Sequence, residues 1–257
     1  MESSEKSGKS EELIKQLELF RRETDKEKEL KERKKDYSRD LGGYGGVFFV
    51  KLKDDGEGIF KPKNKEREFL GRRVEPGTYY KRERAAYLVD RFLGFNLVPP
   101  TVIREIDGEI GSFQEFIPEA KMWHEIRQKD RDKESLKTEM FKLWIFDFII
   151  WNSDRHESNF LLDKNGKKAY AIDNGLSFTA DPLILWKNFD GEPVPIEIQE
   201  KIKQFSSPED KKSILKDLLK ELLPEEEVTA CFKRIEKIAK LIEKEGLIND
   251  DKISFNG

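Results

Sequence analysis

An acid, an amide and a second acid follow one another at spacings that suit phosphoryl transfer. Asn159 lies five residues after Asp154, and Asp173 lies fourteen residues further on, in an Asp-Asn-Gly turn. The transferred group carries negative charge spread over its oxygens, so a protein must mainly position and neutralise it. Mg²⁺ prefers hard oxygen ligands, and a carboxylate can accept the proton of an attacking hydroxyl. We therefore assign Asn159 and Asp173 to the metal and Asp154 to the hydroxyl; for each residue alone, a solvated loop position is the alternative.

The segments around these residues predict a helix, a polar loop, a hairpin and an acidic turn, in that order. Apolar side chains at helical spacing precede the loop (Leu136, Met140, Leu143, Trp144 and Ile150). Residues 160–162 and 169–172 are typical of two short strands joined by the turn at 163–166. Protein kinases use the same order of elements in their catalytic lobe.

An ATP site also needs a cation on the phosphates and a cover over them. Two strands predicted between residues 47 and 62 form a hairpin, and Lys61 lies there between an apolar run and a proline. Before this hairpin, Gly43, Gly45 and Gly46 allow backbone amides to approach phosphate oxygens closely. A flexible linker is the alternative for the glycines, and a surface position on a strand is the alternative for Lys61.

A helix is predicted from Tyr79 to Gly94, where glycine is a natural C-terminal cap. Glu83 lies in its first turns and can pair with Lys61, as a helix glutamate does in kinases. The alternative is that residues 81–84, a run of four charges, face solvent as such runs usually do.

A second hairpin is predicted about residues 107–108, with strands at 98–105 and 110–117. The backbone of Glu115, Phe116 and Ile117 then takes the position of the hinge that hydrogen-bonds adenine. This assignment rests on the order of the elements alone, because no side chain there indicates an adenine site.

Taken together, several segments resemble the phosphatidylinositol 3- and 4-kinase superfamily. These segments are residues 47–51, 58–63, 83–90, 93–99, 152–155 and 171–178. The type II phosphatidylinositol 4-kinases and their small prokaryotic relatives are the most similar group. Each motif is weak alone, and their combination is specific.

The resemblance implies an α+β fold of the bilobal protein-kinase type. The N-lobe is expected at residues 41–117, as a small antiparallel sheet with one helix, and the mainly α-helical C-lobe at residues 118–257. Sequence signals near Pro208, Pro224 and Gly246 predict two amphipathic helices that complete the C-lobe.

The resemblance also implies ATP and Mg²⁺ as cofactors. It places Lys61 on the ATP phosphates with Glu83 as its partner, Asp154 in the catalytic loop, and Asn159 and Asp173 on the metal. In related lipid kinases the histidine of this loop has been considered for proton handling, so His156 rivals Asp154 for that role. A structural role in holding the loop is the alternative for His156.

Residues 1–40 are expected to form a charged, helical N-terminal arm. Four apolar residues there have helical spacing (Leu13, Ile14, Leu17 and Phe20). Residues 21–35 are expected to be a solvated helix or a mobile arm. Contact with a partner is one use of such an arm, and simple solubility is the other.

The sequence leaves the acceptor open between a protein hydroxyl and an inositol lipid. Residues 64–80 lack the cysteine-rich insertion of the type II lipid kinases. The expected activation loop, residues 179–193, contains one basic residue, Lys187, and three acidic ones, which suits an anionic head group poorly. A serine, threonine or tyrosine of a protein, including one of this chain itself, is therefore an equal candidate for the acceptor.

Composition excludes several other classes. The net charge is −3 although 39% of residues are charged, so no general attraction to nucleic acid or membranes is implied. One cysteine, Cys231, excludes an internal disulfide, and two histidines argue against a zinc site. We expect no signal peptide and no integral membrane segment, and hence a cytoplasmic location.

We therefore predict an ATP- and Mg²⁺-dependent kinase that transfers the γ-phosphoryl group to a hydroxyl. One alternative is a nucleotide-binding pseudokinase that acts as a scaffold. Another is a kinase-fold enzyme that transfers AMP, because the orientation of the nucleotide cannot be read from the sequence.

Overall fold

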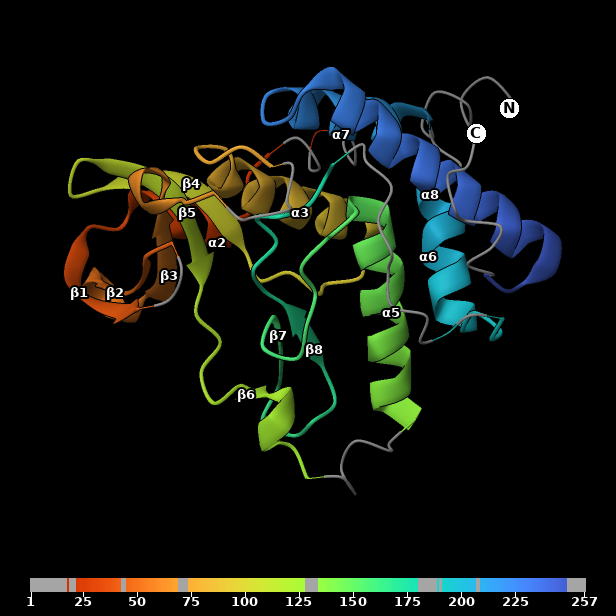
Figure 1. Cartoon of the computed structure of the whole chain (residues 1–257), viewed down its shortest axis with the longest axis horizontal. Helices are drawn as coiled ribbons and strands as arrows, with labels where there is room; N and C mark the ends of the chain where they lie inside the picture. The colour runs from red at the N-terminus through yellow and green to blue at the C-terminus, as the bar shows by residue number, and fades with distance from the viewer. Residues whose placement is uncertain are drawn as a thin grey trace, which may run out of the picture.

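The computed structural model describes residues 18, 22–42, 45–68, 74–127, 134–179, 189, 191–206 and 209–248. Two lobes are visible in Figure 1, a sheet lobe on the left and a helical lobe on the right. The predicted α+β, two-lobed architecture is confirmed. Among the described residues, no helix is both long enough and apolar enough to cross a bilayer.

The sheet lobe is built on five antiparallel strands in the order β1-β2-β3-β5-β4. The strands are β1 (Lys35–Gly42), β2 (Val47–Leu52), β3 (Glu57–Pro62), β4 (Thr101–Ile106) and β5 (Glu109–Glu115). Short 3-10 helices follow β2 and β3, namely η1 (Lys53–Asp55) and η2 (Lys63–Lys65). Both predicted hairpins are present, and at the tip of the second Asp107 and Gly108 adopt positive φ angles of 54° and 81°. Positive φ at both positions matches the twist of a tight hairpin turn.

The described part of residues 21–35 contains a helix, but the expectation that this segment is solvated or mobile is wrong. Strand β1 pairs with β2, and the helix α2 (Asp25–Glu32) packs on the sheet lobe. Leu30 is fully buried in a cluster with Val50 and Phe113. This one leucine, in an otherwise charged helix, holds one face of α2 against the sheet lobe. The sheet lobe therefore has two helices instead of the one expected. The four apolar residues between Leu13 and Phe20 lie outside the described residues.

The helix α3 (Tyr79–Leu93) lies between the lobes in Figure 1. It ends as predicted at Gly94, which adopts the left-handed conformation with a φ of 71°. Most of its buried apolar side chains belong to the large core that continues into the helical lobe, and the helix also contacts β4 and β5 of the sheet lobe, whose strands have a separate small core. A shift of α3 would therefore change packing contacts in both lobes.

The helical lobe also contains a small three-stranded antiparallel sheet in the order β6-β7-β8. Its helices are α5 (Glu134–Ile150), α6 (Ile196–Ser206), α7 (Glu209–Lys220) and α8 (Glu225–Glu245), and its strands are β6 (Lys121–Met122), β7 (Phe160–Leu162) and β8 (Ala169–Ala171), with the 3-10 helix η3 (Trp123–Glu125) after β6. The predicted helices α5, α7 and α8 and the hairpin β7–β8 are present. Sequence analysis missed α6, β1 and β6, and β6 is only two residues long.

Candidate active site

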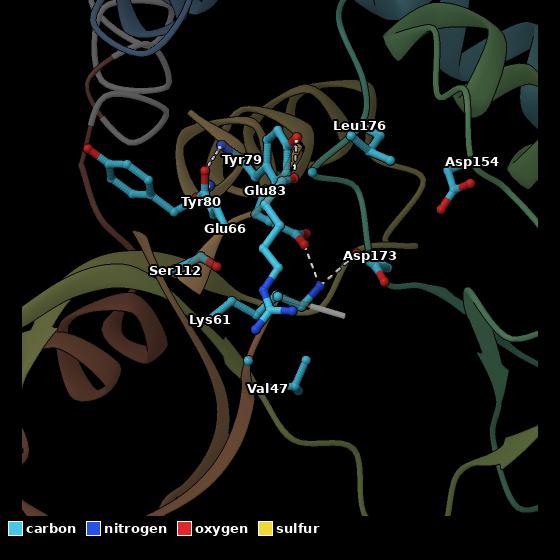
Figure 2. A pocket seen from close by; sticks show the side chains of 14 residues that line it. Val47, Lys61, Glu66, Tyr79, Tyr80, Glu83, Ser112, Asp154, Asp173 and Leu176 are labelled. Carbon is cyan, nitrogen blue, oxygen red and sulfur yellow. Dashed lines mark hydrogen bonds and ion pairs between the residues drawn. The ribbon is translucent and has the colours of Figure 1, made fainter. Parts of the chain in front are cut away.

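Lys61 reaches the space between the lobes because of its register in β3. Phe60 and Pro62 on either side of it are buried in the sheet lobe, so the Lys61 side chain leaves the opposite face. Its ammonium nitrogen lies 2.6 Å from a carboxylate oxygen of Glu83 and 2.9 Å from one of Asp173. Figure 2 shows the three side chains converging. The ion pair expected between Lys61 and Glu83 is confirmed.

Lys61 and Asp173 fix each other's charge. Burial alone would lower the pKa of Lys61, but the carboxylates of Asp173 and Glu83 outweigh it and raise that pKa above its ordinary value. The attraction of Lys61 in turn lowers the pKa of Asp173. Lys61 and Asp173 are therefore both ionised at neutral pH. One ammonium between two carboxylates leaves net negative charge, which favours binding of a cation.

Glu83 is held by more than Lys61. Only 3% of its surface is exposed, and its second carboxylate oxygen accepts a hydrogen bond from the backbone N–H of Asn174 at 3.0 Å. Its neighbours on α3 are also engaged: Arg82 donates to the carbonyl of Ser177, and Arg84 to the carbonyl of Thr101. The alternative that this charge run faces solvent is wrong for Arg82 and Glu83, which are both buried.

The Asp173 turn depends on a backbone that comes close to α3. Asp173 has a positive φ of 57°, which aspartate tolerates better than most residues. At Gly175 an added Cβ would lie 3.0 Å from the Cβ of Tyr79, so only glycine allows this approach without displacement. The glycine explains why the turn lies against the start of α3, within reach of Glu83.

Asp154 and Asn159 lie in the loop that follows α5. The Asn159 side chain donates its amide nitrogen to the main-chain oxygen of Asp154 at 2.7 Å. The Asp154 backbone N–H donates to Asn152 at 2.9 Å. Trp151, at the start of the loop, has a φ of 54°, which is strained for a bulky residue. Such strain is typical of loops whose conformation is fixed for function.

Arg155 holds this loop together, and sequence analysis gave it no role. Its guanidinium binds both carboxylate oxygens of Asp147 on α5, at 3.1 and 2.9 Å. It also donates to the main-chain oxygens of Asn159 and Ile172 and, at 2.6 Å, to the side-chain oxygen of Asn174. One buried side chain thus positions the residues on both sides of Asp173. The signal for it was Asp147, the one acid in the otherwise apolar run of residues 143–150.

His156 lies at the edge of this arrangement. Its Nε2 is 3.9 Å from a carboxylate oxygen of Asp154, and its Nδ1 accepts a weak hydrogen bond from the backbone N–H of Ser158 at 3.3 Å. More than half of its side chain is exposed, compared with 30% for Asp154. The geometry brings His156 near the proposed acid without placing it inside the pocket described next.

A pocket of about 70 Å³ contains the centre of this site. Of the residues assigned from the sequence, those lining it are Lys61, Glu83, Asp154, Asp173, Gly45 and Gly46. Sequence analysis missed other lining residues, including Glu66, Arg67, Tyr79, Tyr80 and Ser112. Its volume is well below the roughly 300–1,000 Å³ of typical ligand pockets, so it has room for a small polar group and not for a whole drug-sized ligand.

Gly45 and Gly46 form a turn over one side of the pocket. Their φ angles are 112° and 70°, and an added Cβ at Gly46 would lie 2.8 Å from the side chain of Lys65. Glycine is therefore required there by both conformation and space. Gly43 lies outside the described residues.

The backbone of Glu115, Phe116 and Ile117 follows β5, next to the strand that carries Lys61. The N–H of Glu115 donates to Pro100 and that of Phe116 to Glu57. None of the three residues lines the pocket that contains Lys61. Their role toward adenine stays a prediction.

The residues present fit a hard cation. Among the described residues, no three His, Cys, Asp or Glu side chains gather closely enough to hold a metal, so an amide oxygen would have to contribute. The amide nitrogen of Asn159 donates a hydrogen bond to Asp154, and its amide oxygen is the atom that can ligate a cation. Its main-chain oxygen accepts from Ile172 at 3.2 Å, which places Asn159 beside the Asp173 turn.

Comparison with known proteins agrees with this geometry. A family model described as phosphatidylinositol 3- and 4-kinase matches residues 73–228, more than half of the chain. The chain belongs to this family. As a member of the phosphatidylinositol 3- and 4-kinase family it is a phosphotransferase. The matched region includes Glu83, Asp154 and Asp173, whereas Lys61 lies before it. No curated protein sequence matches the chain.

Solved structures that resemble this family member share its fold. The Golgi casein kinase with manganese and ADP bound is 19% identical, with a TM-score of 0.54 over 85% of this chain and 76% of that chain. A Helicobacter pylori proinflammatory kinase, CtkA, is 12% identical, with a TM-score of 0.55 over 87% of this chain and 95% of that chain. The kinase-like, two-lobed fold is thereby confirmed.

Proposed function

We propose that this protein uses ATP and a divalent cation, Mg²⁺ in the first instance, to phosphorylate a hydroxyl group. The observation that carries the proposal is the contact of Lys61 with Asp173, 112 residues apart, in a pocket that Asp154 also lines. The ammonium of a lysine and two carboxylates, contributed by both lobes, meet in this pocket, and phosphoryl transfer needs such a set of groups. The fold shared with a structure that holds manganese and ADP supports the choice of cofactors.

Each residue has a distinct part in this proposal. Lys61 holds the phosphates of ATP, and Glu83 keeps Lys61 extended toward them. Asp173 and Asn159 hold the cation, which when bound neutralises phosphate charge. Asp154 orients the acceptor hydroxyl and takes its proton as the new P–O bond forms and the bond to the ADP leaving group breaks. His156, 3.9 Å from Asp154, is the rival for the proton.

Asp154 is favoured over His156 by position. Asp154 lines the pocket with Lys61 and Asp173, and the amide of Asn159 orients it through its main chain and, at 3.4 Å, its carboxylate. His156 is more exposed and does not line that pocket. We therefore expect Asp154→Asn to lower the transfer rate at least about 100-fold, the usual scale for a residue that stabilises charge during the reaction. We expect His156→Gln to lower it much less.

The acceptor is tested directly with labelled ATP and Mg²⁺. The full chain is incubated alone, with an acidic protein such as casein, and with phosphatidylinositol vesicles. Label on a protein supports a protein acceptor, which the likeness in fold to a casein kinase makes the first choice. Label on lipid supports the acceptor that the family name suggests. The matched control for Asp154→Asn is Asp36→Asn, an exposed acid on β1.

Two outcomes would overturn the proposal. Nucleotide binding with no transfer to any acceptor would favour a pseudokinase scaffold. Transfer of AMP, recognised by the mass added to the product and by label from the α- rather than the γ-phosphate, would favour the adenylyl-transfer alternative.

A further inference from the structure

Helix α2 contacts α3 through Arg84 and Arg91, which do not line the pocket. The Glu27 side chain is fully buried and lies 2.6 Å from the guanidinium of Arg84 and 3.3 Å from that of Arg91. One of its carboxylate oxygens also accepts the backbone N–H of Thr24 at 2.8 Å, which closes the start of α2. A buried carboxylate with this many partners is rigidly placed.

Glu27 is charged where it lies. Burial alone would raise the pKa of its carboxyl, but Arg84 and the backbone N–H of Thr24 lower that pKa below its ordinary value. The two arginines, which lie two turns apart on α3, are therefore both held by one ionised group on α2.

A second contact ties α2 to the segment expected to bind adenine. Lys26, next to Glu27, lies 2.9 Å from a carboxylate oxygen of Glu115 at the end of β5. Leu30 on the same helix is buried in the core of the sheet lobe. The C-terminal end of α2 is fixed as well, since Arg104 of β4 donates to the main-chain oxygens of Leu30 and Arg33.

The contact between α2 and α3 is connected to the active site through two adjacent residues of α3. Arg84, which binds Glu27, directly follows Glu83, which binds Lys61 and the backbone of Asn174. Residues adjacent on a helix move together, so a rotation of α3 that separated Arg84 from Glu27 would also shift Glu83 from Lys61. The two ion pairs therefore hold α3 on two faces that lie about 100° apart around its axis.

We propose that α2 is a built-in clamp on α3, and that Glu27 is a positioning residue for the Lys61–Glu83 pair. This proposal rests on the proposed function. It adds that the segment 22–33, which lies before the region matched by the family model, sets the geometry of the site through its contacts with α3. Loosening the clamp lowers the transfer rate without altering any residue that touches substrate.

The test uses Glu27→Gln in the full chain, with Glu32→Gln on the exposed face of α2 as the matched control. We expect Glu27→Gln to lower kcat about 10-fold or more, because small displacements of catalytic groups are costly, and to change KM for ATP less. Glu32→Gln should leave both unchanged.

A double-mutant cycle separates positioning from general destabilisation. If Glu27 acts through Glu83, then adding Glu27→Gln to Glu83→Gln costs little further activity, because the pair it positions is already gone. Additive losses in the two variants would overturn the proposal.

Hydrogen exchange provides a readout that does not need activity. Backbone amides of α3 should exchange faster in Glu27→Gln than in Glu32→Gln, at a temperature where both remain folded. Equal protection of α3 would overturn the clamp, even if the wild-type protein transferred no phosphate and the proposed function itself had failed. If Glu27→Gln does not fold, Arg91→Gln, which removes the longer ion pair, takes its place in both tests.

Discussion

The ammonium nitrogen of Lys61 lies 2.9 Å from a carboxylate oxygen of Asp173, and this contact joins the sheet lobe to the helical lobe. The Asp173 side chain is 55% exposed while that of Glu83, on the other side of Lys61, is only 4% exposed. Asp173 is thus the accessible partner and Glu83 is the fixed one; under the proposed function, Asp173 is the acid that can release Lys61 to hold a cation. Substitutions at the two acids should therefore have different consequences.

Asp173→Asn should abolish activity with little loss of stability. The change removes a charge proposed to hold the cation, and we expect the transfer rate to fall at least about 100-fold. Because the side chain is half exposed, the midpoint of thermal unfolding should move little. Asp36→Asn on β1 serves as the control for charge alone. A variant that kept nearly full activity would remove Asp173 from the proposed site.

Lys61→Met should lower both activity and stability. Without the ammonium, Glu83 is left as a buried charge with the Asn174 backbone as its remaining partner, which costs about 3 kcal/mol in the free energy of unfolding. The double variant Lys61→Met/Glu83→Gln should recover most of that stability but none of the activity. Urea unfolding together with the transfer assay distinguishes the two effects. Recovery of activity in the double variant would contradict the role of Lys61 on the phosphates.

Arg155→Lys should behave as a severe substitution despite keeping the charge. Lysine cannot reproduce the planar fork that binds Asp147, two main-chain oxygens and Asn174 together. Disrupting this buried network should cost about 3–5 kcal/mol in the free energy of unfolding.

The measurement for Arg155→Lys is denaturant unfolding, followed by the transfer assay at a temperature where the variant is folded. Activity should still be reduced there, because the loop around Asn159 and the turn at Asp173 share this support. Arg39→Lys, an exposed arginine on β1, is the control. A variant as stable as that control would show that the network contributes little.

Asp90 should make stability depend on pH. Burial raises its pKa to about 7 in the folded protein, against the backbone hydrogen bond from Val98 that favours the ionised form. Between pH 4 and 7 the folded state then holds a proton that the unfolded state has released. The free energy of unfolding should therefore fall as pH rises through this window.

Asp90→Asn, which stays uncharged, should lose this dependence. Urea unfolding at pH 5 and pH 7.5 should show a larger drop for the wild type than for the variant. Other carboxyls with a raised pKa, such as Asp147, are common to both proteins and cancel in the comparison. Parallel pH profiles would show that Asp90 does not titrate in this range.

The sequence by itself determined most of the elements, although not α6, β1 and β6, and the residue types that carry charge in the site. Periodicity and turn signals predicted α3, α5, α7, α8 and the hairpins, because these elements depend on local spacing and on glycine and proline conformations. The acids and the lysine of the site were found in the same way, by type and order along the chain.

Tertiary structure alone decided which charges are buried and what holds them. A run such as residues 81–84 has the composition of a solvent-exposed surface, and only the packing of α3 between two lobes gives each of Arg82, Glu83 and Arg84 a partner distant in sequence. The same is true of α2, whose charged sequence is typical of a mobile arm until Glu27 meets the arginines of α3. Local pattern does not encode such contacts, because the energy of an ion pair depends on the distance and burial of a partner from another part of the chain.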